Sequence, residues 1–339
     1  MNRPPVQRRE PLGILIGTDD GLLVCLPGAH TTRAIEGARV TSIDVRGDVA
    51  AVGATGAGGG LWLHDAARWE QAWSGDVASV TLGAGAIYIG TGDGHLLRST
   101  DGGATWEETH GVATLRHDGS AMPPRPRPPA VTGVLELSSG LLVAFDGGGT
   151  WFTADDGGSW FRRDEGLDPL VRRLYGHPDV DGRLYVTTAT GLYRSTDQGH
   201  VWVQSLTDLD RGAGGTLAVL PDTTDTLLLS LGRTSAGGGA PPSMPGERST
   251  AAHPSASRGN GGGEGALFRS PDGGRHWSRV LLDGEDEWTA PPAVVHPREL
   301  EDVVFVAAGA RLFASHDRAQ TWMPLADDLP PANVIAASV

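Results

Sequence analysis

The sequence predicts an all-β fold assembled from repeated units of short strands. The first observation is an eight-residue pattern, S/T-x-D-x-G-x-x-W, that occurs five times, with alanine replacing the glycine in the last copy. The second is that each copy follows a short apolar run, as expected for a strand that enters a tight turn. The third is composition, because 50 of the 339 residues are glycine and no long helical period is present. Repetition of this kind is typical of folds built from one supersecondary unit.

We call the five copies the octets; they cover residues 99–106, 153–160, 195–202, 270–277 and 315–322. In each octet the Asp carboxylate can accept hydrogen bonds from backbone amides of its own turn. The Gly allows a backbone conformation that a side chain would obstruct, and the Trp offers a large apolar face to a neighbouring unit. Turn chemistry explains these residues, so we interpret the carboxylates as structural and not catalytic. The residues are Asp101, Asp155, Asp197, Asp272 and Asp317, with Trp106, Trp160, Trp202, Trp277 and Trp322. The last octet has Ala319 in the glycine position, and we expect its turn to be altered.

The octet resembles the Asp-box, also called the bacterial neuraminidase repeat, of the sialidase-like superfamily. The resemblance rests on the five octets and does not extend to the rest of the chain. It implies a β-propeller in which each octet forms the turn between the third and fourth strands of a blade. In related propellers the ligand or catalytic site lies on the opposite face of the ring.

Placing the octets in this way puts the other apolar runs in register. Five blades each carry an octet, and their first strands are expected at residues 78–82, 134–137, 171–175, 216–220 and 293–295. Their second strands are expected at residues 87–90, 141–144, 183–186, 226–231 and 303–307. The third strands directly precede the octets, at residues 95–98, 151–152, 192–194, 266–269 and 311–314, and the fourth strands begin at the octet tryptophans.

Two blades without an octet precede these five. One is expected to use residues 42–45, 49–52, 61–63 and 69–73, and the first blade residues 14–16, 22–24 and 31–35. The first blade lacks an initial strand, and the spare apolar run 333–337 can supply it. Such pairing would close the ring and remove an open sheet edge. The sequence therefore predicts a single domain over residues 1–339, a seven-bladed β-propeller of four-stranded antiparallel blades whose blade 1 is closed by the C-terminal strand. Six or eight blades are the alternatives.

Three segments do not fit the repeat. Residues 1–11 are expected to be a flexible N-terminus. Residues 111–130 form a Pro/Arg-rich loop, which is expected to be an extended spacer, with a proline-rich ligand motif as the alternative. Residues 232–265, rich in Gly, Pro and Ser, are expected to be a disordered insertion between the second and third strands of blade 6.

Composition excludes several functions. The formal charge of −14 argues against nucleic acid as a partner. All 27 basic residues are arginine, which excludes Schiff-base, P-loop and general-base lysines. Cys25 is the single cysteine and is interpreted as a small buried hydrophobe, with a reactive thiol as the alternative. No segment approaches the roughly 20 apolar residues of a membrane span, so we expect no such span and a cytoplasmic location.

The face opposite the octets is where chemistry is expected. It receives acidic connections between the later blades, including Asp286 and Glu287, which could attract a cation or a basic partner or could simply be solvated. It also receives a group of His and Asp residues that could bind a divalent metal ion or share a proton. That group contains Asp93, His95, His110, His117 and Asp118. No cofactor is predicted, with a divalent cation as the alternative.

A sialidase-like activity would need a Tyr nucleophile, an arginine triad and a Phe/Tyr-Arg-Ile-Pro segment before the first octet, and that segment is absent. Tyr175, near Arg172 and Arg173 on an inner strand, is the one tyrosine worth testing. The leading hypothesis is a monomeric, non-enzymatic propeller that binds a protein or small-molecule ligand through this face and the central channel. The alternatives are a glycoside hydrolase or lyase with its site at the channel mouth, and an assembly factor for a protein complex.

Overall fold

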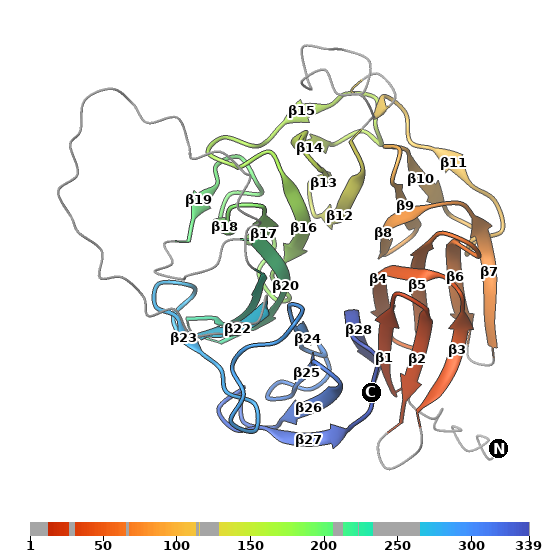
Figure 1. Ribbon diagram of the computed structural model, residues 1–339. Coiled ribbons are helices and arrows are strands. Elements are labelled where there is room, and N and C mark those ends of the chain that lie inside the picture. Colours follow the sequence, from red (N-terminus) through yellow and green to blue (C-terminus); the bar gives the residue numbers. More distant parts are fainter. Residues whose placement is uncertain are drawn as a thin grey trace, which may run out of the picture.

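The computed structural model describes residues 13–26, 31–65, 68–112, 115, 129–205, 213–222, 224–232 and 265–338. Its strands form seven four-stranded antiparallel sheets, which are arranged as the blades of a ring (Figure 1). This confirms the predicted seven-bladed β-propeller. The expectations for residues 1–11, and for most of residues 111–130 and 232–265, concern segments outside the described residues.

Each blade runs outward from the centre of the ring. From blade 1 to blade 7 the innermost strands are β28 (Ala332–Ser338), β4 (Arg39–Arg46), β8 (Val77–Leu82), β12 (Val131–Leu137), β16 (Val171–Gly176), β20 (Ala213–Leu220) and β24 (Ala293–Val295). The second strands are β1 (Gly13–Thr18), β5 (Val49–Thr55), β9 (Ile87–Thr91), β13 (Gly140–Phe145), β17 (Leu184–Thr188), β21 (Thr226–Gly232) and β25 (Val304–Ala308).

The third strands are β2 (Gly21–Cys25), β6 (Gly60–Asp65), β10 (Leu96–Ser99), β14 (Gly149–Thr153), β18 (Leu192–Ser195), β22 (Gly265–Ser270) and β26 (Arg311–Ser315). The outermost strands are β3 (Thr32–Glu36), β7 (Arg68–Ser74), β11 (Glu107–Glu108), β15 (Phe161–Arg162), β19 (Val203–Gln204), β23 (Ser278–Arg279) and β27 (Met323–Ala326). Every residue of β21 is buried, whereas both residues of β15 are exposed. The second strands therefore have mostly continuous apolar sequences, because neighbouring blades cover both of their faces.

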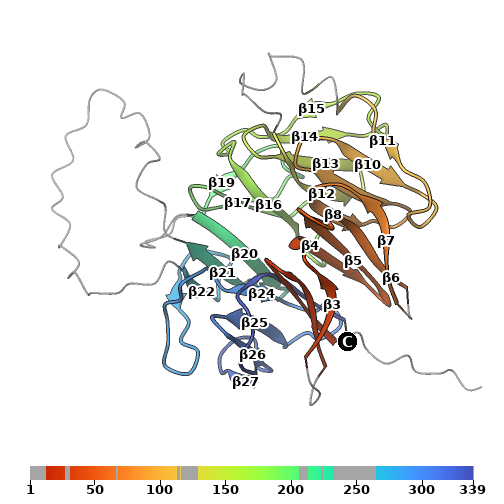
Figure 2. The same ribbon diagram turned by 45° about the vertical axis from the view of Figure 1, so that its right-hand side comes forward.

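The last strand of the chain closes the ring. In β28, Ala337 pairs with Ile14 and Val334 with Gly17 of β1, which completes blade 1 as predicted. Alternate side chains of β28 point to opposite neighbours, as strand geometry requires. Ile335 and Ala337 pack in the core shared with blade 7, and Val334 packs in the core shared with blade 2. Figure 1 places β28 beside β1, and Figure 2 shows the same ring turned by 45°.

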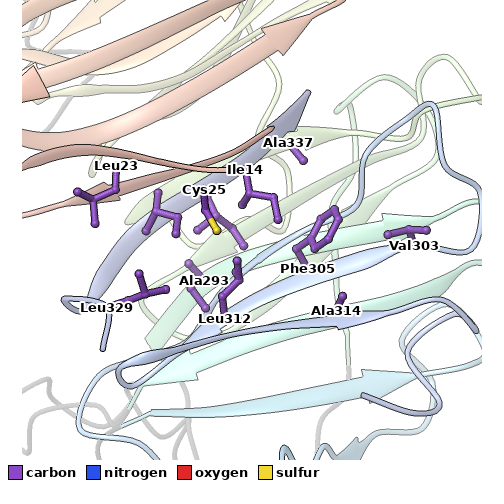
Figure 3. Packing of buried hydrophobic residues seen from close by; sticks show 13 residues of the cluster. Ile14, Leu23, Cys25, Ala293, Val303, Phe305, Leu312, Ala314, Leu329 and Ala337 are labelled. Carbon is purple, nitrogen blue, oxygen red and sulfur yellow. The ribbon is translucent and has the colours of Figure 1, made fainter. Parts of the chain in front are cut away.

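Apolar side chains of blades 1 and 7 form a shared core (Figure 3). Cys25 and Leu23 of β2 contribute to it from blade 1, and Phe305 and Leu312 contribute from blade 7. Cys25 is 5% exposed and its thiol is free. This burial agrees with its interpretation as a small hydrophobe, because a reactive thiol would need solvent access.

Neighbouring blades approach closely because small or hydroxyl side chains stand where they meet. The Ser79 hydroxyl of blade 3 donates a hydrogen bond of 2.8 Å to the Val131 carbonyl of blade 4. Gly90 leaves the space for this contact, since a methyl group there would lie 2.6 Å from the Val131 carbonyl oxygen and 2.4 Å from Ser79 Oγ. The Thr132 hydroxyl makes the equivalent bond to the Val171 carbonyl of blade 5, at 3.2 Å.

All five octets form the turn between the third and fourth strands, as predicted, and share one set of hydrogen bonds. In the first octet, Asp101 Oδ1 accepts the Thr105 amide at 2.9 Å, and Ser99 Oγ accepts the Gly103 amide at 2.8 Å. In the other octets the equivalent amide-to-hydroxyl bonds are donated by Gly157, Gly199, Gly274 and Ala319. The octet Asp therefore acts as the organiser of its own turn.

The expectation of an altered turn in the last octet is wrong. Ala319 adopts a φ of +63°, in the left-handed region that Gly103 occupies in the first octet at +96°. Its amide still bonds Ser315 Oγ at 2.9 Å, and Asp317 Oδ1 still accepts the Thr321 amide at 2.8 Å. A left-handed alanine costs about 1–2 kcal/mol, and the retained hydrogen bonds and the burial of its methyl group oppose that cost.

Three of the octet tryptophans attach their blade to the blade before it, whereas the Trp277 indole donates to Gly274 of its own octet. The indole N–H of Trp106 donates to the Ala72 carbonyl at 3.3 Å, and that of Trp160 donates to the His110 carbonyl at 2.9 Å. Trp202 makes the corresponding bond to the Arg163 carbonyl at 3.0 Å. Each acceptor lies in or just after the outermost strand of the preceding blade. The predicted contact with a neighbouring unit thus includes a hydrogen bond as well as an apolar surface.

The octet carboxylates predict a loss of stability in acid. Hydrogen bonds from the hydroxyl and amide of Thr105 lower the pKa of Asp101 to about 2, and those of Thr321 do the same for Asp317, also to about 2. Because the folded-state pKa lies below the unfolded value, this stabilisation is fully present above about pH 4. It should be lost as the pH falls through 2. Denaturant unfolding measured from pH 6 to pH 2 should show this decline.

The matched variants are Asp101→Asn and Asp156→Asn. Asp101→Asn should be less stable at pH 6 and should depend less on pH between 4 and 2. Asp156 is an exposed octet residue outside the shared set of turn hydrogen bonds, so its variant should follow the parent protein. Identical acid dependence for the parent and Asp101→Asn would contradict this account.

Candidate functional site

The two faces of the ring carry different connections. Turns from first to second strands and from third to fourth strands lie on one face with the octets, which we call the octet face. Turns from second to third strands and the connections from blade to blade lie on the other, which we call the linker face. His177 and His296 follow innermost strands β16 and β24, and therefore lie on the octet face as expected.

The innermost strands surround a central channel. Hollows of about 500 Å³ at its linker-face mouth, 260 Å³ within it and 330 Å³ towards the octet face are lined by residues of these strands. Arg173 of β16 lines all three. Its guanidinium Nη2 donates to the Thr41 carbonyl of β4 at 3.3 Å. Because β16 and β4 belong to blades 5 and 2, the side chain reaches across the channel.

A β-bulge lets two consecutive arginines line the same hollow. The pairing of β16 with β17 shifts register between Val171 and Arg173. Regular alternation would send Arg172 and Arg173 to opposite sides of the strand, whereas a bulge places an extra residue on the same side. Both side chains therefore line the linker-face mouth of the channel. Strand β4 carries the equivalent shift between Val40 and Ser42.

The linker-face mouth is basic. Arg39, at the start of β4, lines it together with Arg172 and Arg173, and no Asp or Glu is among the described residues that do so. Arg39 Nε lies 3.1 Å from Asp19, and Arg172 Nη1 lies 3.2 Å from Asp146. The Arg39 side chain remains 65% exposed, and the bond of Arg173 to Thr41 leaves its charge without a matching carboxylate in the lining. The mouth can therefore attract an anion.

Sequence reasoning identified Arg172 and Arg173 and missed Arg39. Arg39 lies 133 residues before Arg172, and only ring closure brings their strands around one channel. No local pattern marks Arg39, which stands at a strand start like many exposed arginines. The bulge in β16 likewise has no sequence signal that a period-two analysis could detect.

Deeper in the channel, Asp44 is the acidic counterpart of these arginines. Its Oδ2 accepts the Leu82 amide of the next blade at 2.7 Å. Burial raises the pKa of Asp44, and the Leu82 bond and the charge of Arg298 oppose that rise. A carboxyl group held in this way supports the contact between β4 and β8 and lines the channel wall.

Tyr175 is placed as a link between innermost strands. Its hydroxyl accepts the Leu217 amide at 3.1 Å and donates to the Gly215 carbonyl at 3.5 Å, both in the next blade. Burial raises the pKa of Tyr175, so the phenol stays protonated at neutral pH. A tyrosine nucleophile needs a lowered pKa or a neighbouring base that accepts its proton.

The His and Asp group of blade 3 is only partly assembled. Asp93 Oδ2 lies 3.6 Å from His95 Nε2, and Glu108 Oε1 lies 2.9 Å from His95 Nδ1. Glu108, which sequence reasoning missed, is thus the group that meets His95. His110 contributes its carbonyl to Trp160, whereas His117 and Asp118 lie outside the described residues. Within the described chain, no cluster of three or more His, Cys, Asp or Glu side chains is arranged to hold a metal ion.

The acidic connections of the later blades are matched by arginines. Asp286 and Glu287 each lie 3.2 Å from Arg279 Nη1. Arg311 in blade 7 similarly bridges two carboxylates, Asp283 at 2.8 Å and Asp327 at 2.9 Å. These pairs partly neutralise the negative potential expected from the sequence.

On the octet face the structure contains a buried carboxylate that sequence reasoning missed. Asp225, 3% exposed, accepts His177 Nε2 at 2.9 Å, Arg183 Nη1 at 2.5 Å and the Tyr185 hydroxyl at 3.1 Å. His177 Nδ1 accepts the amides of Asp179 and Val180, so its Nε2 carries the proton. These contacts join blade 6 to blade 5 and explain His177 as a structural residue.

No protein-family model and no curated protein matches this sequence. Solved structures share its fold at low identity. A GH74 enzyme from Niastella koreensis is 16% identical with a TM-score of 0.60, over 91% of this chain and 46% of that chain. YCF48 bound to D1 peptide is 16% identical with a TM-score of 0.54, over 93% and 91%. YCF48 from Cyanidioschyzon merolae is 14% identical with a TM-score of 0.55, over 94% and 98%.

These similarities show the propeller fold alone. The chain spans less than half the length of the GH74 enzymes that it resembles, but nearly the whole length of YCF48. Among the described residues, no helix has the length and apolar character that crossing a membrane requires.

Proposed function

We propose that this protein is a non-enzymatic binding scaffold whose linker face and central channel take an anionic group, a carboxylate above all, from a protein or small-molecule ligand. The observation that carries the proposal is the guanidinium of Arg173, which crosses the channel beneath Arg39 and Arg172. Guanidinium groups match carboxylates in charge and in planar geometry. The protein has a formal charge of −14, so its overall charge would repel an anion. Attraction of the anion would therefore come from the local positive charge of the arginine-lined mouth.

The proposal can be tested with simple anions and side-chain NMR. Citrate and an acidic peptide with a free C-terminus, alongside its C-terminal amide, would be titrated into protein with ¹⁵N-labelled arginine. We expect saturable shifts of the Arg173 Nε signal and weaker binding of the amide. Loss of one charge-assisted bond, about 1.5–3 kcal/mol, corresponds to a decrease in affinity of about tenfold or more for Arg173→Leu.

Arg298→Leu is the matched control, because Arg298 lines the channel hollow towards the octet face. It should bind the same anions as the parent protein. Binding that survives Arg173→Leu unchanged, or no binding of any carboxylate probe, would refute the proposed site.

The glycoside hydrolase or lyase alternative finds less support. Its candidate nucleophile, Tyr175, is a protonated phenol committed to the backbone of β20. Turnover of a glycoside panel by the parent protein, lost in Tyr175→Phe, would restore that alternative.

An assembly role is the second candidate function. It is favoured by the near-equal length of this chain and YCF48, a propeller whose structure was solved with a D1 peptide. If this chain likewise binds a protein partner through the channel mouth, tagged protein should retain a stoichiometric partner from native lysate. Arg173→Leu should release that partner, and Arg298→Leu should not.

A further inference from the structure

A second hollow, of about 690 Å³, opens on the linker face between blades 2 and 3. It is formed by the end of β7, the connection from blade 2 to blade 3, and the turn between β9 and β10. It is separate from the channel mouth but close to it. Thr55 lines the mouth, and the next residue, Gly56, donates its amide to Asp76 of the second hollow at 3.0 Å.

An indole ring forms one wall of this hollow. Trp73 is half-buried, with its inner side against the core of blades 2 and 3. The outer edge of its six-membered ring lies against Gly75, where a methyl group would come within 2.4 Å of the indole. Gly75 has a φ of +143°, so any side chain there would be both strained and in collision with the ring. Glycine at position 75 therefore leaves room for the Trp73 indole beside the opening.

The remaining polar walls are acidic. Asp76 and Asp93 both line the hollow, and no arginine is among the described residues that do so. The Asp93 side chain is 70% exposed. Its turn is fixed by the Thr91 hydroxyl, which donates to Asp93 Oδ1 at 2.5 Å and accepts the His95 amide at 2.8 Å. This lining is the reverse of the channel mouth, where three arginines and no carboxylate meet.

The imidazole of His95 completes the wall, with a carboxylate behind it. Its Nδ1 lies 2.9 Å from Glu108 Oε1, which orients the ring so that Nε2 lies on the side of Asp93. A third carboxylate thus adds to the negative potential of the hollow without lining it. A positively charged group in the hollow would face Asp76, Asp93 and the indole together.

We propose that this hollow binds a guanidinium group, presented by an arginine side chain of a partner protein or by a small molecule. A guanidinium can stack its plane on an indole while its edge N–H groups bond carboxylates. An ammonium group is a compact point charge and cannot make both contacts with the same geometry. A neutral sugar could stack on Trp73 but would make no charge-assisted hydrogen bond with Asp76 or Asp93.

The test compares a guanidinium probe with its uncharged urea analogue. N-acetyl-L-arginine methylamide and its uncharged citrulline analogue would be titrated into ¹⁵N-labelled protein while the Trp73 indole signal is observed. The signal would be assigned by its loss in Trp73→Phe. We expect a saturable shift with the arginine probe and none with the citrulline analogue. Agmatine and the capped tripeptide Gly-Arg-Gly then distinguish the two sources, since tighter binding of the peptide indicates a protein partner and tighter binding of agmatine a small molecule.

Asp93→Asn and Asp76→Asn should each weaken the arginine probe by about tenfold or more, the loss expected for a charge-assisted hydrogen bond. Asp286→Asn is the matched control, because it removes a linker-face carboxylate that already pairs with Arg279. Arg173→Leu should also leave binding unchanged, so failure of the channel proposal would not affect this result. Equal binding of the citrulline analogue, no saturable shift with any guanidinium probe, or unaltered affinity in both Asp variants would overturn the assignment.

Discussion

Deletion of residues 332–339 is expected to abolish cooperative folding of the ring. The deletion removes β28, which pairs along the whole of β1 and fills the space between blades 7 and 2. Full burial of Val334 and Ile335 contributes about 1.5–3 kcal/mol each. Removing them also exposes the apolar side chains beneath and leaves β1 as an open, aggregation-prone edge. Together these losses are comparable with a typical unfolding free energy of about 5–15 kcal/mol.

Soluble yield, near-UV circular dichroism and denaturant unfolding would measure the effect. A peptide covering residues 330–339, added during refolding, should restore part of the native signal because it can occupy the place of β28. The control is an equal deletion of residues 240–247, in the insertion that the sequence predicts to lie outside the blades. A truncated chain that unfolds with the parent midpoint would show that β28 does not close the ring in solution.

Asp225→Ala is expected to lower the free energy of unfolding by at least about 1.5–3 kcal/mol, because it removes charge-assisted hydrogen bonds to a buried carboxylate. The substitution leaves the guanidinium of Arg183 and the imidazole N–H of His177 without their acceptor. It also removes the hydrogen bond of Tyr185, whose pKa is raised by burial and by the Asp225 charge. Asp225 has a φ of +60°, a conformation that Asp tolerates better than Ala.

Equilibrium urea unfolding would measure this change. Asp302→Asn provides the control, since Asp302 is 60% exposed and its ion pair with Arg318 lies on the same face. An exposed pair contributes about 0–1 kcal/mol, so this variant should remain near the parent. If Asp225→Ala lost no more stability than Asp302→Asn, the carboxylate would not be the junction between blades 5 and 6.

The charged groups of the protein have different roles on the two faces of the ring. On the octet face, carboxylates accept bonds from their own turn or from the neighbouring blade, and these contacts hold the ring together. On the linker face, Arg173 and Asp93 line hollows of opposite charge. Binding is therefore expected on the linker face, where charged groups line hollows. Substitutions in these hollows are expected to leave the stabilising contacts of the octet face intact.

The strand plan of the propeller was predictable because it depends on local patterns. The octets place the third and fourth strands of five blades, and period-two or continuous apolar runs place the others. The closing run predicted at residues 333–337 lies within β28, which covers Ala332–Ser338. Turn chemistry also identified the octet carboxylates as hydrogen-bond acceptors for backbone amides of their own turns. The exception is Ala319, whose left-handed conformation is imposed by its surroundings and not favoured by its residue type.

The sequence by itself determined the register of the blades, the closing strand and the face on which each turn lies, because these follow from strand periodicity and turn residues. Only the tertiary structure decided which side chains meet. Arg173 reaches the Thr41 carbonyl across 132 positions of sequence, and Asp225 meets His177 across 48. Such contacts depend on how closely blades approach and on where a bulge redirects a side chain. Those are properties of the closed ring, and no window of sequence contains them.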